Sequence, residues 1–204
     1  MAEPAKKRAT YADLEAVPEH FVAEIIDGEL FTHPRPSPRH ALAANELIYE
    51  LTGPFRRGRG GPGGWMFLVE PELHLGEEVV VPDVAGWRRE RLLVLPDTAY
   101  LEIAPDWMCE VLSGSTERRD RTVKMRVYAE AQVPYFWLID PRQQILEAFE
   151  LQEGRWLKTG GWSSDDTVSA PPFDAIAFSL ADLWPLDRPL GLDEDPQALY
   201  AGDR

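Results

Sequence analysis

Hydrophobic and polar positions divide the start of the chain into a short helix and a hairpin. Thr10 can cap a helix over residues 11–17, which Pro18 ends because proline disfavours helical geometry in the residue before it. In residues 20–33 the dipeptide Asp27-Gly28 lies between two apolar runs. This is the strongest short-range signal of a β-hairpin, since its turn needs two positive φ values.

A second helix is predicted from Ser37 and Pro38, with apolar residues at helical spacing until Gly53-Pro54 stops it. The Gly-rich segment 53–64 follows and carries three arginines without an acidic residue: Arg56, Arg57 and Arg59. Two interpretations stay open for it. It is either a solvated loop with incidental charge or an arm that orders on a phosphate backbone.

Apolar runs predict most of the remaining elements. Two strands are expected on either side of Gly76, and residues 88–105 are charged and loop-like. Strands are predicted over residues 64–75, 77–87, 106–113, 133–140, 143–151 and 154–159, and helices over residues 115–132, with Ser115 or Thr116 as the cap, and 179–185. Pro141 and Arg142 form a turn, and residues 189–204 are an acidic tail with little pattern. The order predicts an α/β (α+β) fold, a mixed β-sheet flanked by helices.

Composition supports one soluble domain. The 204 residues are 44% hydrophobic and 27% charged, which is enough to bury a sizeable core. We expect a single domain over residues 1–204, with a core of about 11–150 and a C-terminal extension of 151–204. No apolar run reaches the roughly 20 residues of a membrane span, and the first residues lack a signal peptide's apolar core, so a cytoplasmic location is expected. The single cysteine, Cys109, is expected to be a core thiol.

The net charge of −14 argues against a non-specific nucleic-acid binder, because phosphate backbones repel an acidic chain. A nucleic-acid substrate would then need a local positive region made by bound cations, by the arginine segment or by dimerisation. Apolar strands and aromatic residues give a modest expectation of a homodimer.

Two carboxylates stand in apolar surroundings. Asp83 follows Pro82 at a strand bend, and Glu110 is the charged residue between Cys109 and Val111. An unpaired carboxylate there would cost several kcal/mol, so each needs a partner, and a shared divalent cation such as Mg²⁺ would serve both. Lys124, on the helix after Glu110, can reach the same pocket.

A structural interpretation of the same residues stays open. Asp83 can accept backbone hydrogen bonds in a turn, and Lys124 can form an exposed pair with Asp120 four residues earlier. The arrangement as a whole nevertheless resembles the PD-(D/E)xK nuclease signature: a Pro-Asp at a strand bend, a glutamate in an apolar strand and a capped helix with a lysine.

The resemblance extends over roughly residues 11–150. The segments AEIIDGEL, SPRHALAANEL, VVVPDV and DWMCEVLSGSTERRDRTVKMRVYAEAQVPYFWLID are similar in order and spacing to the Uma2 (DUF820) family. This resemblance implies a restriction-endonuclease-like fold and Mg²⁺-dependent DNA endonuclease activity. Asp83 and Glu110 match the metal-binding carboxylates, Lys124 matches the catalytic lysine, and Glu24 and His40 match accessory positions.

One position departs from the superfamily signature. The lysine usually stands two residues after the acidic residue, where this chain has Leu112, so Lys124 must act from the helix. The expected chemistry is phosphodiester hydrolysis by water with Mg²⁺ or Mn²⁺ as the cofactor, and the carbonyl of Val111 is a candidate additional ligand. Glu24 either holds a second ion, orients a ligand, or is an exposed hairpin carboxylate.

Three further interpretations complete the sequence-based picture. His40 lies near a helix start, where an exposed or capping imidazole is more common than a catalytic one. Four aromatic residues are assigned to core packing and not to the site: Tyr128, Tyr135, Phe136 and Trp137. The competing function is a nuclease-fold protein without chemistry that binds nucleic acid or a protein partner.

Overall fold

The computed structural model describes residues 7–114 and 116–187. Its helices are α1 (Tyr11–Glu15), α2 (Pro38–Leu51), α3 (Glu117–Arg119) and α4 (Met125–Glu130), with π-helical turns η1 (Thr52–Arg56) and η2 (Asp120–Lys124) and 3₁₀ turns η3 (Leu180–Leu183) and η4 (Pro185–Asp187). The strands are β1 (Phe21–Ile26), β2 (Glu29–Pro34), β3 (Trp65–Val69), β4 (Glu72–Leu75), β5 (Glu78–Val80), β6 (Val84–Arg88), β7 (Tyr100–Leu101), β8 (Trp107–Val111), β9 (Tyr135–Asp140), β10 (Ile145–Gln152), β11 (Arg155–Ser163), β12 (Thr167–Val168) and β13 (Phe178–Ser179). The acidic tail of residues 189–204 lies outside the described residues.

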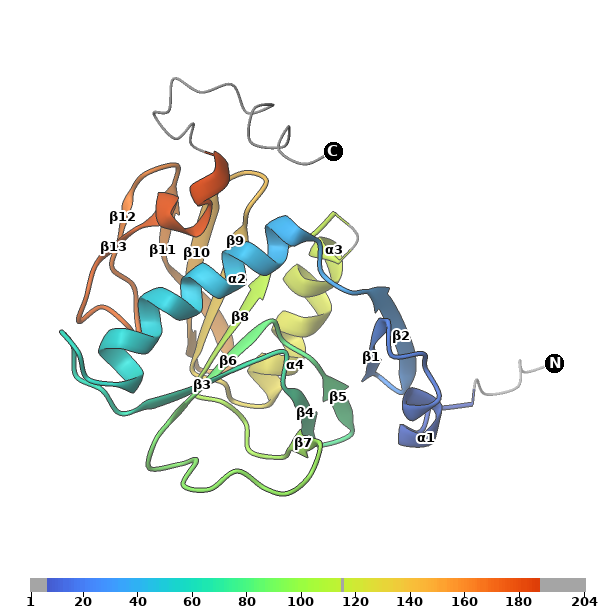
Figure 1. Cartoon of the computed structure of the whole chain (residues 1–204). Helices are drawn as coiled ribbons and strands as arrows, with labels where there is room; N and C mark the ends of the chain where they lie inside the picture. The colour runs from blue at the N-terminus through green and yellow to red at the C-terminus, as the bar shows by residue number, and fades with distance from the viewer. Residues whose placement is uncertain (1–6, 115, 188–204) are drawn as a thin grey trace, which may run out of the picture.

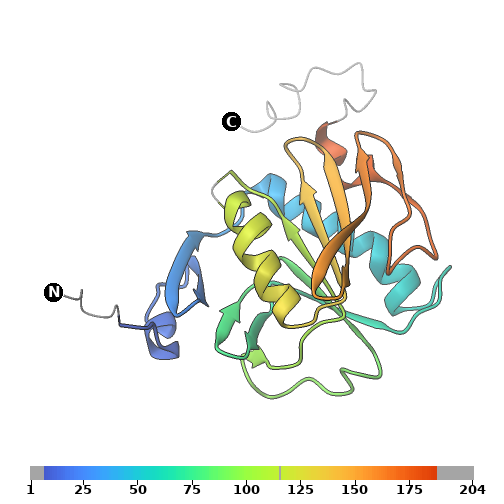
Figure 2. The same ribbon diagram turned by 180° about the vertical axis from the view of Figure 1, so that it is seen from behind.

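The central layer is a six-stranded sheet in the order β11-β10-β9-β8-β6-β3. Strands β8 and β9 are parallel, whereas β8 pairs with β6 in the antiparallel sense. Helix α2 crosses one face of this sheet and α4 lies on the other (Figures 1 and 2). The mixed sheet flanked by helices therefore confirms the fold class predicted from the sequence.

Strand β8 shows how the sequence sets the two faces. Trp107, Cys109 and Val111 belong to the core cluster that also contains the buried residues of α2, and Cys109 is a buried free thiol, as predicted. Met108 belongs to the cluster on the other face, together with Val127 and Tyr128 of α4. Because side chains alternate along a strand, Glu110 lies on the same face as Met108 and points toward α4.

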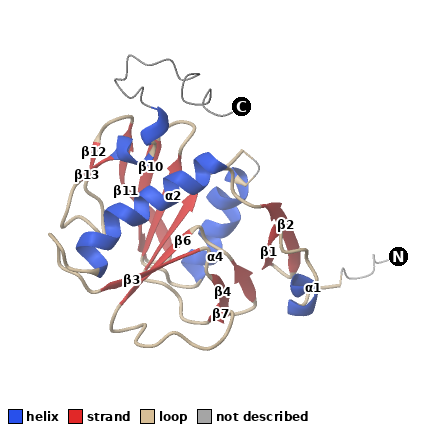
Figure 3. Cartoon of the chain, in the orientation of Figure 1, coloured by secondary structure: helices blue, strands red, loops and turns tan. Residues whose placement is uncertain are grey.

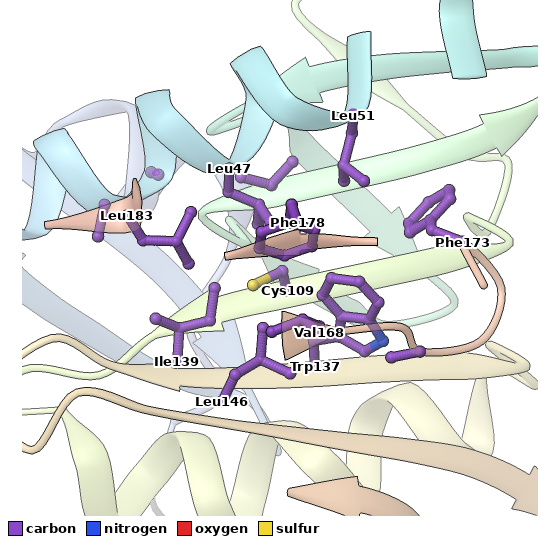
Figure 4. Packing of buried hydrophobic residues seen from close by; sticks show 14 of the residues in the cluster. Leu47, Leu51, Cys109, Trp137, Ile139, Leu146, Val168, Phe173, Phe178 and Leu183 are labelled. Atoms are coloured by element: carbon purple, nitrogen blue, oxygen red, sulfur yellow. The ribbon is translucent and has the colours of Figure 1, made fainter. Parts of the chain in front are cut away.

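The α2 side of the sheet carries the larger core. Figure 4 shows how Leu47 and Leu51 of α2 pack with Cys109, Trp137 and Phe178. Residues beyond 150 contribute to this core through Val168, Phe173 and Leu183, so the C-terminal part closes the sheet from the same side as α2. The strand predicted at 154–159 is present and extends to Ser163, and the helix predicted at 179–185 is the short turn η3.

A second sheet has the order β2-β1-β5-β4-β7 and lies beside the central one (Figure 3). Two predictions were wrong here, because the strands expected over residues 64–75 and 77–87 each divide in two. The first breaks at Glu70 and Pro71, where Glu70 has a φ of 46°, and the second breaks around Pro82. A proline cannot donate to a strand ladder, so the chain leaves one sheet and enters the other at these points.

The predicted hairpin is confirmed between β1 and β2. Asp27 and Gly28 have φ values of 55° and 74°, which the tight turn requires. A side chain at position 28 would also meet Arg8, since an added Cβ would lie 2.6 Å from its Nε. The short helix α1 is confirmed as well, and Thr10 forms a capping box with Asp13.

Helix α2 begins as predicted and ends at Leu51, just before Gly53-Pro54, and a π-helical turn follows it. The Ser37 hydroxyl accepts a bond from the His40 amide and Pro38 opens the first turn, whereas the chain continues past Pro54 through the π-helical turn η1. The Arg57 amide donates to the carbonyl of Thr52, five residues earlier, at 3.1 Å. A wider turn tolerates proline because it moves the ring away from the carbonyl that would clash with it in an α-helix.

The helix predicted over residues 115–132 is present as α3, η2 and α4 in sequence, but its capping differs from the prediction. Ser115 lies outside the described residues, and Thr116 occupies the cap position without a side-chain cap bond. The Thr116 hydroxyl lies 3.0 Å from that of Ser113 instead. In the middle, the Met125 amide reaches the carbonyl of Asp120, which widens one turn of the helix.

Candidate active site

A cavity of about 190 Å³ opens between the β2–α2 connection, the end of β8 and the helix that follows β8. Its lining residues are His33, Pro34, Arg35, Pro36, Ser37, His40, Val81, Asp83, Glu110, Ser113, Thr116, Asp120 and Lys124. Four residues singled out from the sequence are therefore brought together: Asp83, Glu110, Lys124 and His40. They come from four different elements or connections of the chain.

Asp83 lies at the junction where the chain re-enters the central sheet. The pairing of Val84 with Cys109 places Asp83 opposite Glu110, next to the start of β6. Its Oδ2 accepts a hydrogen bond of 2.7 Å from the amide of Val111, and its Oδ1 lies 2.8 Å from His40 Nε2. Asp83 does accept a backbone bond, as the structural interpretation held, but the bond comes from β8 and aligns the two carboxylates.

Glu110 is 3% exposed and lies in the interior of the protein. Burial raises the pKa of Glu110 well above its usual value; the ammonium of Lys124 opposes this, whereas Asp83, Asp120 and Glu24 add to it. Its Oε1 lies 2.7 Å from Lys124 Nζ and also accepts a hydrogen bond from the Tyr128 hydroxyl. The cluster therefore contains more negative than positive groups around this carboxylate.

Lys124 does not form the exposed pair with Asp120 that the structural interpretation allowed. Its side chain is 3% exposed, and Nζ lies 3.0 Å from Glu24 Oε1 and donates to the carbonyl of Val81 at 3.2 Å. Burial lowers the pKa of Lys124, but Glu110 and Glu24 outweigh it and raise the pKa well above its usual value. The helix thus places an ammonium beside Glu110, although the strand position that usually carries the lysine, two residues after the acidic residue, has Leu112 in this chain.

Glu24 is not an exposed hairpin carboxylate, because only 1% of its surface is accessible. Its Oε1 accepts the amide of Val81 at 2.9 Å as well as Lys124, which lies 3.0 Å away. Its Oε2 lies 3.7 Å from Arg119 Nη1 and 3.9 Å from His33 Nε2. Glu24 is therefore surrounded by donors and cations, and it is the second carboxylate, besides Glu110, that contacts Lys124.

His40 is buried, so the expectation of an exposed or purely capping imidazole was wrong. Its amide takes part in the cap with Ser37, while its ring reaches Asp83 in the cavity. Nε2 lies 2.8 Å from Asp83 Oδ1, and the geometry of this contact is not that of an aligned hydrogen bond. Helix α2 therefore places the imidazole of His40 beside Oδ1 of Asp83.

Sequence reasoning missed three residues of this region. Asp120 is 3% exposed and lines the cavity, and burial, partly offset by Lys124, raises its pKa. Tyr128 was correctly assigned to the core but wrongly left out of the site, since its hydroxyl contacts Glu110. The signal was present, because Asp120, Lys124 and Tyr128 recur at four-residue intervals on one helix face. His33 also lines the cavity.

The arginine segment lies elsewhere. Arg56, Arg57 and Arg59 are exposed and follow the C-terminal end of α2, whereas His40 lies in its first turn (Figure 1). A 14-residue helix is about 21 Å long, so the whole of α2 separates these arginines from the cavity. Arg57 and Arg59 line a separate surface hollow together with Tyr49 and Pro54.

The donor set at the cavity fits a hard divalent cation. Among the described residues, no group of three or more His, Cys, Asp and Glu side chains is close enough to form a complete metal cage. Asp83 and Glu110 are two adjacent carboxylates, and Mg²⁺ is commonly held by one or two carboxylates with water and substrate phosphate completing the shell.

A family model described as "Uma2: Putative restriction endonuclease" matches residues 8–181. The chain belongs to the Uma2 family. Among solved structures, it is similar to one described as "a putative nuclease belonging to DUF820 from Anabaena variabilis", with a TM-score of 0.69 and 21% identity over 87% of this chain and 98% of that one.

The structural similarity establishes that this Uma2 chain has the restriction-endonuclease-like fold. No curated protein matches the sequence. No helix of the described residues is long and apolar enough to cross a membrane.

Proposed function

We propose that this protein is a nuclease that hydrolyses phosphodiester bonds of DNA with Mg²⁺ or Mn²⁺ as its cofactor. The observation that carries the proposal is that Asp83, next to the start of β6, lies opposite Glu110 of β8, with Lys124 in contact with Glu110 at 2.7 Å. Membership in a family described as restriction endonucleases supports the same reaction class.

Asp83, Glu110 and the carbonyl of Val111 are the groups that would hold the cation. The amide of Val111 fixes Asp83, and the carbonyl of the same residue is the proposed additional ligand. When bound, a divalent cation lowers the pKa of water and neutralises charge on a phosphate. The protein's part is to keep the two carboxylates adjacent and partly desolvated.

Lys124 is proposed to stabilise negative charge as the phosphodiester is attacked. Its pKa is raised, so the side chain is an ammonium at neutral pH and cannot accept the proton of the attacking water. Its three N–H groups already meet Glu110, Glu24 and the carbonyl of Val81, so it acts through its positive charge, which offsets the negative charge that develops on the phosphate. The reaction forms a bond between the water oxygen and phosphorus and breaks the bond to the leaving sugar oxygen.

DNA is proposed to approach through the cavity mouth and to contact the arginine segment further along the surface. Arg56, Arg57 and Arg59 are exposed, and together they could neutralise phosphates outside the cavity. Because the net charge is −14, we expect DNA affinity to be weak and salt-sensitive. The single domain, the cytoplasmic location and the homodimer stay predictions.

The proposal is tested by cleavage of plasmid, linear and single-stranded DNA in Mg²⁺ or Mn²⁺. We expect Asp83→Asn and Lys124→Ala each to reduce the rate by about 100-fold or more. Asp174→Asn and Lys158→Ala, at the exposed Asp174 and half-exposed Lys158, are the matched controls and should cleave at the wild-type rate. A wild-type protein that cleaves none of these substrates, or variants that cleave normally, would refute the proposal and favour a binding role.

A further inference from the structure

Tyr128 lies in the core of the protein, yet its hydroxyl reaches the cavity region. The residue is 0% exposed and its ring packs against Phe136, with the ring centroids 5.5 Å apart. The amide of Val133 donates to its carbonyl at 3.0 Å, which fixes the end of the helix. Tyrosine has only two side-chain torsions, so a ring held in this way fixes its hydroxyl in space.

The hydroxyl of Tyr128 donates to Glu110 Oε1, the same oxygen that Lys124 contacts at 2.7 Å. Among the described residues, the hydrogen bond from Tyr128 and the ion pair with Lys124 both involve Oε1 of Glu110. A carboxylate oxygen has two lone pairs, so two donors saturate it. Oε2 is then the oxygen of Glu110 that a cation in the cavity can take.

Lys124 alone would not enforce this arrangement. An ammonium is a flexible point charge with three donors, and it can bridge both oxygens of a carboxylate equally well. A phenol has one donor with a fixed direction. The side chain of Tyr128 therefore selects Oε1 for the donors and turns Oε2 away from them.

From these contacts we propose that Tyr128 is a positioning residue for metal binding: its hydroxyl holds Glu110 with Oε2 directed to the cavity. This inference rests on the proposed function, because it concerns the same carboxylate. Removing a group that orients a metal ligand commonly weakens metal affinity by about 10- to 100-fold. A residue that only filled the core would not change metal affinity when its hydroxyl alone is removed.

The test is isothermal titration of Mn²⁺ into the wild type, Tyr128→Phe and Tyr135→Phe. Tyr128→Phe keeps the ring and should raise the Kd for Mn²⁺ by about 10- to 100-fold. Tyr135 is partly buried against the opposite core cluster, so Tyr135→Phe is the matched loss of a hydroxyl and should leave the Kd unchanged. Thermal unfolding without metal shows whether each variant is folded.

Cleavage as a function of Mn²⁺ concentration gives a second readout. For Tyr128→Phe we expect the metal concentration at half-maximal rate to rise while the rate at saturating Mn²⁺ recovers. A folded Tyr128→Phe with the wild-type Kd would overturn the inference and leave the nuclease proposal intact. A wild type that binds no Mn²⁺ would overturn both, so the two failures are distinguishable.

Discussion

Lys124 and Glu110 form a buried ion pair in which Nζ lies 2.7 Å from Oε1 and each side chain is 3% exposed. The two residues are 14 positions apart and meet because the strand of Glu110 is followed directly by the helix of Lys124. The pair joins the central sheet to the helix on its α4 face. Its removal should therefore affect both stability and catalysis.

Replacing Lys124 alone should destabilise the protein strongly. Lys124→Met leaves Glu110 and Glu24 buried without their ammonium, and breaking a buried pair in this way costs about 3–5 kcal/mol of unfolding free energy. Urea denaturation at pH 7 without metal measures the loss. Adding Glu110→Gln to Lys124→Met should recover part of it, and a single variant as stable as the wild type would contradict the prediction.

Glu24 should act on Lys124 and not on the metal. Both of its oxygens face donors or cations, so Glu24→Gln should lower the cleavage rate at saturating Mg²⁺ by about 10-fold or more while the metal Kd is unchanged. Comparing metal titration with the rate separates the two effects. A weaker metal Kd would instead support the alternative that Glu24 holds an ion.

The arginine segment should influence binding without influencing the chemical step. Replacing Arg56, Arg57 and Arg59 by Ser removes charge at the far end of α2, so the rate at saturating DNA should be unchanged. Each lost phosphate contact should reduce the slope of log affinity against log salt by about 0.9 on duplex DNA. Fluorescence anisotropy across a salt series measures the slope. An unchanged slope would leave the arginines as solvated loop residues.

Asp140 should contribute stability that disappears in acid. Burial opposes its ionisation, but bonds from Arg142 and the Gln143 amide prevail and lower the pKa of Asp140 below its usual value. A carboxyl with a lowered folded-state pKa stabilises the protein fully above its unfolded pKa of about 3.9, and this is lost as pH falls through the folded value.

Asp140→Asn should therefore lower the unfolding free energy at pH 7 by about 1–3 kcal/mol, and the difference from wild type should shrink toward pH 2. Urea denaturation at both pH values measures it, with the exposed Asp174→Asn as the control. A difference that stays constant between the two pH values would show that the charge of Asp140 is not responsible.

The sequence predicted local elements better than their assembly. Asp27-Gly28 specified the first hairpin and the apolar run around Glu110 specified a buried strand, because turn geometry and a short apolar run are local properties of the sequence. The division of residues 64–75 between two sheets was missed, since a strand's partner depends on distant residues. Pro71 carried a signal, but a proline alone does not tell whether a strand bends or changes sheet.

The candidate site was also predicted only in part, because some of its residues meet through contacts between distant elements of the chain. Asp83 and Glu110 were conspicuous because charges are rare in apolar runs, and Lys124 lies beside Glu110 as expected. Tyr128 shares a helix face with Asp120 and Lys124, but a tyrosine is an ordinary core residue, so this spacing alone did not place it in the site. Its hydroxyl became informative only when the helix was placed against the sheet.

The cavity is lined by residues spread between positions 33 and 124, and this has a consequence for how the chain folds. Contacts between residues so far apart in sequence close large loops, and their entropic cost is met only when most of the chain is already ordered. The carboxylates, the lysine and the hairpin glutamate therefore come together late. Metal affinity acquired during refolding would mark the arrival of the native topology, after the local helices and hairpins have formed.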